Sequence, residues 1–317
     1  MKDTILPKYG ILVATKDRPK QLEEFLSSVA KLTVLPDEIV ISSSGVKIDD
    51  LILKYSEKLN LINVHSANSG QVFQKKAGLK CFSKEVEWIA FFDDDIVLIS
   101  NSVESIFQDI SKLSILNNIS GVGFACSNHQ PLKKTKFEFL RKIFLSSNQN
   151  FGQVNKSGYN ASYMESDTLI QTQWLNGASI WRATIARNYD VPFERLKHAI
   201  GEDLIFSYNS LRYGSLFFSA SSKFAFQQYP EVKFQVNYFK LHAYIQLYFV
   251  LSHKSLSRLL FFWRFIGSTF FALSNLNFTS LKTIFEIRQI IMLLLDTTAL
   301  IMSRKTAEYV LRNRINA

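Results

Sequence analysis

Residues 88–95 read Trp88-Ile89-Ala90-Phe91-Phe92-Asp93-Asp94-Asp95, an apolar run of strand length that ends in three carboxylates. A run without alternation is typical of a strand buried on both faces, as in a parallel sheet covered by helices. Such a sheet binds its ligands beyond the carboxyl ends of its strands. The run therefore predicts a central strand of the fold and the edge at which the chemistry takes place.

Strands and helices alternate on either side of this run. Predicted strands occupy residues 9–14, 38–41, 61–64 and 172–177, and predicted helices begin at Pro19, Gln71 and Asp203. This alternation predicts an α/β fold, with a mostly parallel sheet flanked by helices.

The chain changes character at Val236. From there to the C-terminus ten Lys or Arg stand against three acids, so +7 of the net charge of +10 lies in this tail. Its apolar, aromatic segments are too short or too interrupted by charge for membrane spans, which need ~20 apolar residues. We expect two domains, 1–235 and 236–317. The second is a tail of amphipathic helices that lies on an anionic membrane surface. The alternative is a helical appendage that packs on the catalytic domain or on a second subunit, as in a homo-oligomer.

The triplet Asp93-Asp94-Asp95 crowds three like charges, which raises their pKa values. A divalent cation, Mg²⁺ or Mn²⁺, explains the crowding because hard oxygen ligands suit both ions, and the ion would bridge to phosphate. An acidic turn that caps a helix is the alternative. A second acidic pair, Glu202-Asp203, opens the predicted helix that ends near Tyr213. It reads either as a helix cap or as a general base facing the metal site.

Two further segments carry candidate donor contacts. The turn Ala14-Thr15-Lys16-Asp17-Arg18-Pro19 lacks the glycines of a P-loop, so we expect it to hold a base and sugar rather than to wrap phosphates. Lys75 or Lys76, on the helix from Gln71, would meet a diphosphate; a solvated lysine face is the alternative.

In this order, these pieces resemble the inverting glycosyltransferases of family 2, which have a Rossmann-like GT-A fold. The resemblance covers Tyr9 to Gln228 and includes Trp174-Leu175-Asn176-Gly177 and Trp181-Arg182. It implies that Asp203, with Glu202 beside it, deprotonates the acceptor hydroxyl, that Asp95 and Asp93 hold the metal, and that Asn176-Gly177 border the sugar. The implied donor contacts are Ala14, Thr15, Arg18, Ser43, Lys75, Asp93, Asp94, Asn176 and Gly177.

The sequence departs from the family pattern at two places. Ser43 stands near the position of an aspartate that usually reads the nucleobase, and Phe226-Gln227-Gln228-Tyr229 lacks the histidine that often ligates the metal. We therefore expect the cation to rest on Asp95, the diphosphate and water.

The resemblance implies transfer from a nucleotide-sugar to a saccharide or lipid-linked acceptor in bacterial surface polysaccharide synthesis (capsule, O-antigen or similar). The expected location is cytoplasmic and peripheral at the inner membrane face, with no nucleic-acid partner. One alternative is a nucleotidyltransferase, which would need a Gly-rich phosphate loop after the first strand. The other is a membrane-bound scaffold or binding subunit with a degenerate transferase fold.

Overall fold

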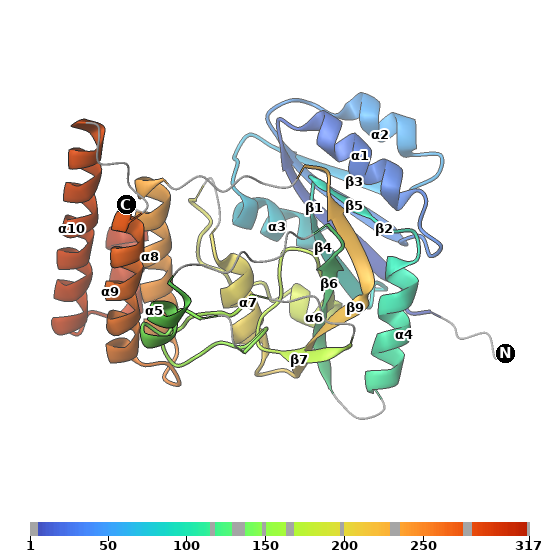
Figure 1. Cartoon of the computed structure of the whole chain (residues 1–317). Coiled ribbons are helices and arrows are strands. Elements are labelled where there is room, and N and C mark those ends of the chain that lie inside the picture. Colours follow the sequence, from blue (N-terminus) through green and yellow to red (C-terminus); the bar gives the residue numbers. More distant parts are fainter. Residues whose placement is uncertain are drawn as a thin grey trace. The chain divides into compact units, whose positions relative to one another are not determined.

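The computed structural model describes residues 6–114, 118–128, 137–147, 150–162, 168–196, 200–228, 235–274 and 281–315, with backbone alone for 114 and 281–283. The chain forms two compact units: unit 1 comprises Met1–Gln130 and Met164–Pro230, and unit 2 comprises Pro131–Tyr163 and Glu231–Ala317 (Figure 1). Unit 2 thus contains residues 131–163 in addition to the C-terminal tail, whereas composition placed them within 1–235. The domain ranges stay predictions.

Unit 1 is an α/β unit. Its strands are β1 (Tyr9–Lys16), β2 (Glu38–Ser44), β3 (Leu61–Ser66), β4 (Trp88–Asp93), β5 (Ile96–Leu98), β6 (Ile119–Cys126), β7 (Ile170–Thr172), β8 (Ser179–Arg182) and β9 (Ser215–Phe226). Its helices are α1 (Pro19–Val29), α2 (Asp49–Tyr55), α3 (Gln71–Leu79), α4 (Ser102–Ser114), α6 (Ala183–Ala186) and α7 (Glu202–Ser210).

The strands pair in the order β3-β2-β1-β4-β8-β6-β9-β5, and β7 pairs with β9. The predicted parallel pairing is confirmed for β1 with β2 and β4 and for β2 with β3. Beyond β4 the sheet is mixed, because β8 runs antiparallel to both β4 and β6. The segment after Thr172, predicted to be strand, forms the loop that leads into β8.

Alternate side chains of the parallel strands face opposite helices. Ile11 and Val13 belong to the core that contains the apolar residues of α1 and α4. Leu12 lies on the other face, where a methyl group added at Gly78 of α3 would be 2.4 Å from its Cδ1. Helices therefore cover both faces, and the strand ends are where side chains can meet a ligand.

Unit 2 is helical. Its elements are α5 (Glu138–Ile143), α8 (Val236–Ser252), α9 (Arg258–Ser274), α10 (Leu281–Met302), α11 (Ala307–Val310) and the π-helix η1 (Leu311–Ile315). Helices α8, α9 and α10 pack on one another (Figure 1). Among the described residues, no helix is long and apolar enough to cross a membrane.

Candidate functional site

The carboxyl ends of β1, β2 and β4 bring the predicted donor contacts into one row. Parallel register sets Ala14 of β1 beside Asp93 of β4 on one side and beside Ser42 of β2 on the other. Gln74 of α3 secures this edge, because its amide donates to the carbonyls of Thr15 and Ser42 at 2.8 and 2.6 Å. These two hydrogen bonds tie α3 to the ends of β1 and β2.

The three carboxylates of the acidic triplet differ in burial. Asp94 is 5% exposed and accepts hydrogen bonds from Thr15 Oγ1 at 2.6 Å and from Arg18 Nη1 at 3.1 Å. Asp95 is the more open: its side chain is 40% exposed and lies 3.3 Å from Arg18 Nη1. Asp94 thus ties the acidic triplet to the turn after β1.

Asp93 meets the second acidic pair next to Gly177. A Cβ added at Gly177 would lie 2.7 Å from Asp93 Oδ2 and 3.6 Å from Asp203 Oδ2, so both carboxylates lie next to the space that a side chain at this position would occupy. Gln71 donates to Asp93 Oδ1 at 3.1 Å. Burial above all raises the pKa of Asp93 to about 6, and the negative charges of Glu202, Asp95 and Asp94 add to the rise against the lowering effect of Lys75.

Glu202 and Asp203 form the first turn of α7, after Gly201 in a left-handed conformation (φ 70°). Lys75 of α3 reaches them: its Nζ lies 3.3 Å from Glu202 Oε1 and 3.5 Å from Asp203 Oδ1. The side chains of Lys75 and Glu202 are 2% and 4% exposed, while Asp203 keeps 30% of its side chain exposed. Asp203 is thus the solvent-accessible member of this pair.

Lys75 is a buried cation held by anions. Burial tends to lower its pKa, but Asp203, Tyr189, Glu202 and Asp93 outweigh burial and hold the pKa of Lys75 well above its usual value. The pKa of Asp203 is raised, first by burial and then by Glu202, while Lys75 opposes the rise. Lys75 therefore stays an ammonium and favours the ionised form of Asp203.

Two aromatic residues that the sequence did not single out complete this cluster. Lys75 Nζ lies 5.6 Å from the ring centroid of Phe91. Tyr189 packs on Phe91 and Phe206, and its buried hydroxyl has no hydrogen-bond partner among the described residues. Neither residue carries a sequence signal, because an aromatic side chain next to a strand or helix is ordinarily core.

Gln227 occupies the region where the family often has a metal-binding histidine. Its side-chain amide donates to the carbonyls of Gln21, Asp94 and Ile96 at 2.8, 3.3 and 3.3 Å. An amide nitrogen engaged in this way ties the acidic turn to α1 and supplies no ligand. Over the ranges that the structure describes, no three His, Cys, Asp or Glu side chains converge as protein ligands of one metal.

Two predicted donor residues have their polar groups turned to protein. The hydroxyl of Ser43 is buried and lies 2.9 Å from Asn63 Oδ1 and 3.1 Å from His65 Nδ1 of β3. Asn176 Nδ2 donates to the carbonyl of Phe124 at 3.4 Å, whereas its buried Oδ1 has no partner in the described part of the chain. The donor-binding roles of all the predicted contacts stay predictions.

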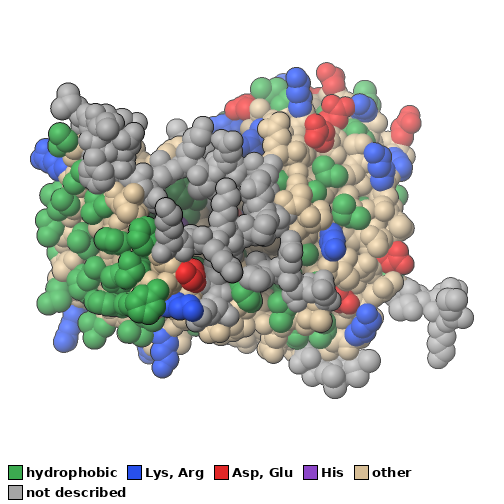
Figure 2. Space-filling view, in the orientation of Figure 1, with side chains coloured by type: hydrophobic (Ala, Val, Ile, Leu, Met, Phe, Trp, Pro, Cys, Tyr) green, Lys and Arg blue, Asp and Glu red, His purple; other side chains and the backbone are tan. Residues whose placement is uncertain are grey.

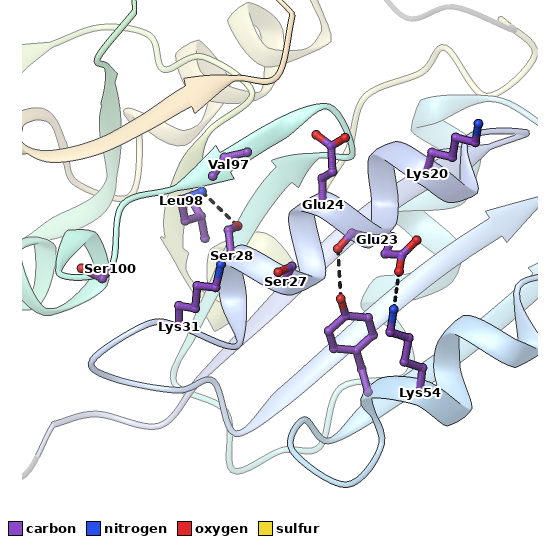
Figure 3. Close-up of a pocket in the computed structure, with 11 residues that line it drawn as sticks. Lys20, Glu23, Glu24, Ser27, Ser28, Lys31, Lys54, Val97, Leu98 and Ser100 are labelled. Atoms are coloured by element: carbon purple, nitrogen blue, oxygen red, sulfur yellow. Dashed lines mark hydrogen bonds and ion pairs between the residues drawn. The ribbon is translucent and has the colours of Figure 1, made fainter.

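A surface hollow of about 770 Å³ lies elsewhere in unit 1, between α1, α2 and β5 (Figure 3). Lys54 pairs with Glu23 at 2.5 Å in it, and Leu98 N donates to Ser28 Oγ at 3.1 Å. None of the predicted site residues lines this hollow. The hollow is therefore separate from the site at the strand ends.

Comparison with known proteins relates the chain to one family. Residues 10–167 match the sequence model described as glycosyl transferase family 2. No curated protein sequence matches the chain. Among solved structures, S. aureus TarS 1–349 in complex with UDP-GlcNAc is 16% identical with a TM-score of 0.55, covering 98% of this chain and 88% of that one.

Two further structures share the fold. GalNAc-T7 with UDP, GalNAc and Mn²⁺ is 12% identical with a TM-score of 0.55, covering 98% of this chain and 57% of that one. The mannosyltransferase PcManGT from Pyrobaculum calidifontis with GDP-Man and Mn²⁺ is 10% identical with a TM-score of 0.53, covering 95% and 89%. At these identities the likeness concerns the fold, and it agrees with the predicted GT-A architecture.

Proposed function

Because the chain belongs to glycosyl transferase family 2, we propose that it transfers a sugar from a nucleoside-diphosphate donor to an acceptor hydroxyl with inversion. The observation that carries this proposal is the proximity of the Asp93 and Asp203 carboxylates, both of which lie within 4 Å of a Cβ added at Gly177. One carboxylate comes from the end of a buried strand and the other from the start of α7. Donor and acceptor groups need this kind of convergence for direct displacement at the anomeric carbon.

Asp203 is the proposed general base. It is the exposed member of the Glu202-Asp203 pair, and it lies beside a buried ammonium that favours its ionised form. A carboxylate that accepts the proton of a hydroxyl during attack typically contributes about 10²–10⁴-fold in rate. Lys75 acts through Asp203 as a positioning residue, and Glu202, buried against Lys75, supplies the second anion of the cluster.

The donor is proposed to lie along the ends of β1, β2 and β4. Its nucleoside would contact Ala14, Thr15, Ser43, Asp94 and the Asp93 carboxylate. Arg18 pairs through Nη1 with Asp94 and Asp95, and its side chain is 51% exposed, so its other guanidinium nitrogens would face a diphosphate. Two structures of similar fold hold UDP-GlcNAc and GDP-Man, which supports a nucleotide-sugar donor and leaves its base and sugar open.

Asp93 and Asp95 would hold a divalent cation, Mg²⁺ or Mn²⁺. The residues fit it: two carboxylates lie two positions apart at a strand end, and both are oxygen donors of the kind that these ions prefer. Phosphate and water would complete the oxygen ligands. When bound, such an ion neutralises charge on a leaving diphosphate. Two structures of similar fold contain Mn²⁺.

We place the reaction in the synthesis of a bacterial surface polysaccharide, on a saccharide or lipid-linked acceptor, at the inner face of the cell membrane. The +7 charge of the tail from Val236 supports attraction to an anionic leaflet. The test of the transferase proposal is turnover of a panel of nucleotide-sugars by the purified protein with Mg²⁺ or Mn²⁺, with Asp203→Asn as comparison. We expect this variant to lose about 10²–10⁴-fold in kcat while nucleotide affinity is unchanged.

Wild-type turnover by Asp203→Asn, or loss of nucleotide binding instead, would remove Asp203 from its role. The complete absence of turnover by the wild-type protein on every donor, with nucleotide binding intact, would favour a binding subunit over an enzyme. No described feature favours the nucleotidyltransferase alternative, because the turn from Thr15 to Pro19 has no glycine.

A further inference from the structure

Helices α5 and α9 of unit 2 expose a group of large apolar side chains. Here this group is called the α5–α9 patch. Its members and their exposed fractions are Phe137 (42%), Phe139 (73%), Ile143 (41%), Leu259 (74%), Leu260 (37%), Trp263 (44%) and Phe270 (45%). Contiguous exposed apolar surface of this kind marks a place where a protein meets another molecule or a membrane.

Contacts show that the two segments form one surface. The rings of Phe137 and Phe270 lie 6.4 Å apart. Farther along, Trp263 Nε1 donates to the carbonyl of Ile143 at 2.8 Å, and its ring lies 5.1 Å from that of Phe144. Residues more than a hundred positions apart in the chain therefore make a single patch, which the sequence of the tail alone did not reveal.

The exposed apolar side chains of α9 are distinct from those that form the core of unit 2. On α9, Leu259, Trp263 and Phe270 follow one another at helical spacing on the exposed stripe, whereas Phe261, Phe265 and Phe271 are 1%, 3% and 8% exposed. The aromatic residues of the tail thus divide into two sets, one that stabilises unit 2 and one that faces outward.

Basic side chains lie next to the patch. Lys142 is exposed on α5 beside Ile143, and Lys254 is exposed in the turn before α9. Lys156 is exposed and its carbonyl accepts from Ser257 N at 2.8 Å, which places it at the start of α9 near Arg258. Figure 2 shows hydrophobic side chains gathered over the helices of unit 2, with Lys and Arg at the margin.

We propose that the α5–α9 patch is the surface by which this protein binds an anionic lipid bilayer, with the apolar side chains in the headgroup boundary and the lysines on the phosphates. Charge complementarity selects this occupant: Lys142, Lys156, Lys254 and Arg258 border the patch, against Glu138 as the acid of α5. Trp263 suits the interface, since its apolar ring is exposed while its N–H is satisfied by Ile143. The proposal specifies the membrane location stated under the proposed function and is independent of the catalytic roles.

The test is co-sedimentation of the full chain with vesicles of phosphatidylglycerol and phosphatidylcholine, and with vesicles of phosphatidylcholine alone. We expect binding to the anionic vesicles, weakened by high salt. Leu259→Glu should lower that binding more than about tenfold, because it removes one large side chain from the apolar contact and adds a like charge to the lipid. Leu53→Glu on α2 is the matched control: Leu53 is 75% exposed, Leu259 is 74% exposed, and the change in charge is the same.

A second comparison uses α10, whose exposed residues Ile291, Met292 and Leu295 form another apolar stripe. Arg288 is exposed one turn before this stripe, whereas four basic residues border the α5–α9 patch. If the patch is the bilayer contact, Leu295→Glu should leave vesicle binding within about twofold of wild type. Three outcomes would each overturn the proposal. The first is that Leu295→Glu, but not Leu259→Glu, releases the protein from anionic vesicles, and the second is that the protein binds neutral vesicles equally well. The third is that the protein binds no vesicles and is a soluble oligomer that Leu259→Glu dissociates. Nucleotide-sugar turnover without vesicles, measured on every variant, separates this outcome from failure of the transferase proposal, and thermal melting confirms that each variant is folded.

Discussion

Replacing Lys75 by methionine removes the positive charge of the side chain and nearly preserves its volume. The Lys75 ammonium lies 3.3 Å from Glu202 and 3.5 Å from Asp203, and its side chain is 2% exposed. At such distances the gross attraction is about 5 kcal/mol per pair with an effective dielectric constant of ~20. The net loss is smaller, because Asp203 keeps solvent contact. Removing one partner of a buried pair typically costs about 3–5 kcal/mol, and we expect Lys75→Met to fall in this range.

The same change shifts the pH dependence of turnover. The base works in its ionised form, and Lys75 opposes the rise in the pKa of Asp203. Without the Lys75 ammonium the pKa of Asp203 rises further. As the pH is lowered, activity is therefore lost at a higher pH than in the wild type. We expect the acidic limb of the kcat profile to move upward by about one pH unit or more. A role of Lys75 in packing alone would leave this limb in place.

Urea unfolding and a pH profile of kcat at saturating substrate measure both effects. Lys76→Met is the matched control: Lys76 is the next residue of α3, and it pairs with Glu194 at 2.5 Å near the surface, with side-chain exposures of 27% and 52%. Its loss should cost at most about 1 kcal/mol. The reasoning fails if Lys75→Met is no less stable than Lys76→Met and keeps the wild-type acidic limb. Lys75→Met combined with Glu202→Gln should recover part of the stability, because it also removes a stranded charge.

Two further variants probe the strand ends. Asp95→Ala should abolish cation-dependent turnover with little change in melting temperature, and chelation should reproduce the loss in the wild type; near-normal turnover would show that Asp95 holds no essential ion. Gly177→Ala places a methyl group 2.7 Å from Asp93 Oδ2, so displacement of that carboxylate should lower kcat about a hundredfold. Gly123→Ala on β6, where the nearest atom is Leu175 Cδ2 at 3.1 Å, is its control, and equal activity of the two variants would contradict the role of Gly177 as the spacer between the carboxylates.

Much of the parallel half of the fold is readable from local pattern. Apolar runs and helical spacing act over a few residues, so β1, β2, β3, β4, α1 and α3 were predicted close to their observed bounds. The mixed half was not: β6 and β9 carry no recognised signal, and the segment after Thr172 became a loop. Short strands depend on the neighbours they pair with, which a single sequence does not state.

The acidic triplet and the Glu202-Asp203 pair were likewise predicted as site residues, because adjacent carboxylates at a strand end or helix start can be recognised in the sequence. Their meeting next to Gly177 is a property of the tertiary structure, as is the pairing of Lys75 with Glu202, 127 positions away in the chain. From the sequence, Lys75 was predicted to be a cation that meets a diphosphate. The residues next to it in α3 indicate neither its burial nor its partners. Which side chains are enclosed, and which of the aromatic residues in the tail remain outside, is decided by packing between distant segments. The identity of the chemical groups and the order of the elements can be predicted from local sequence, whereas packing between distant segments sets which of those groups face one another.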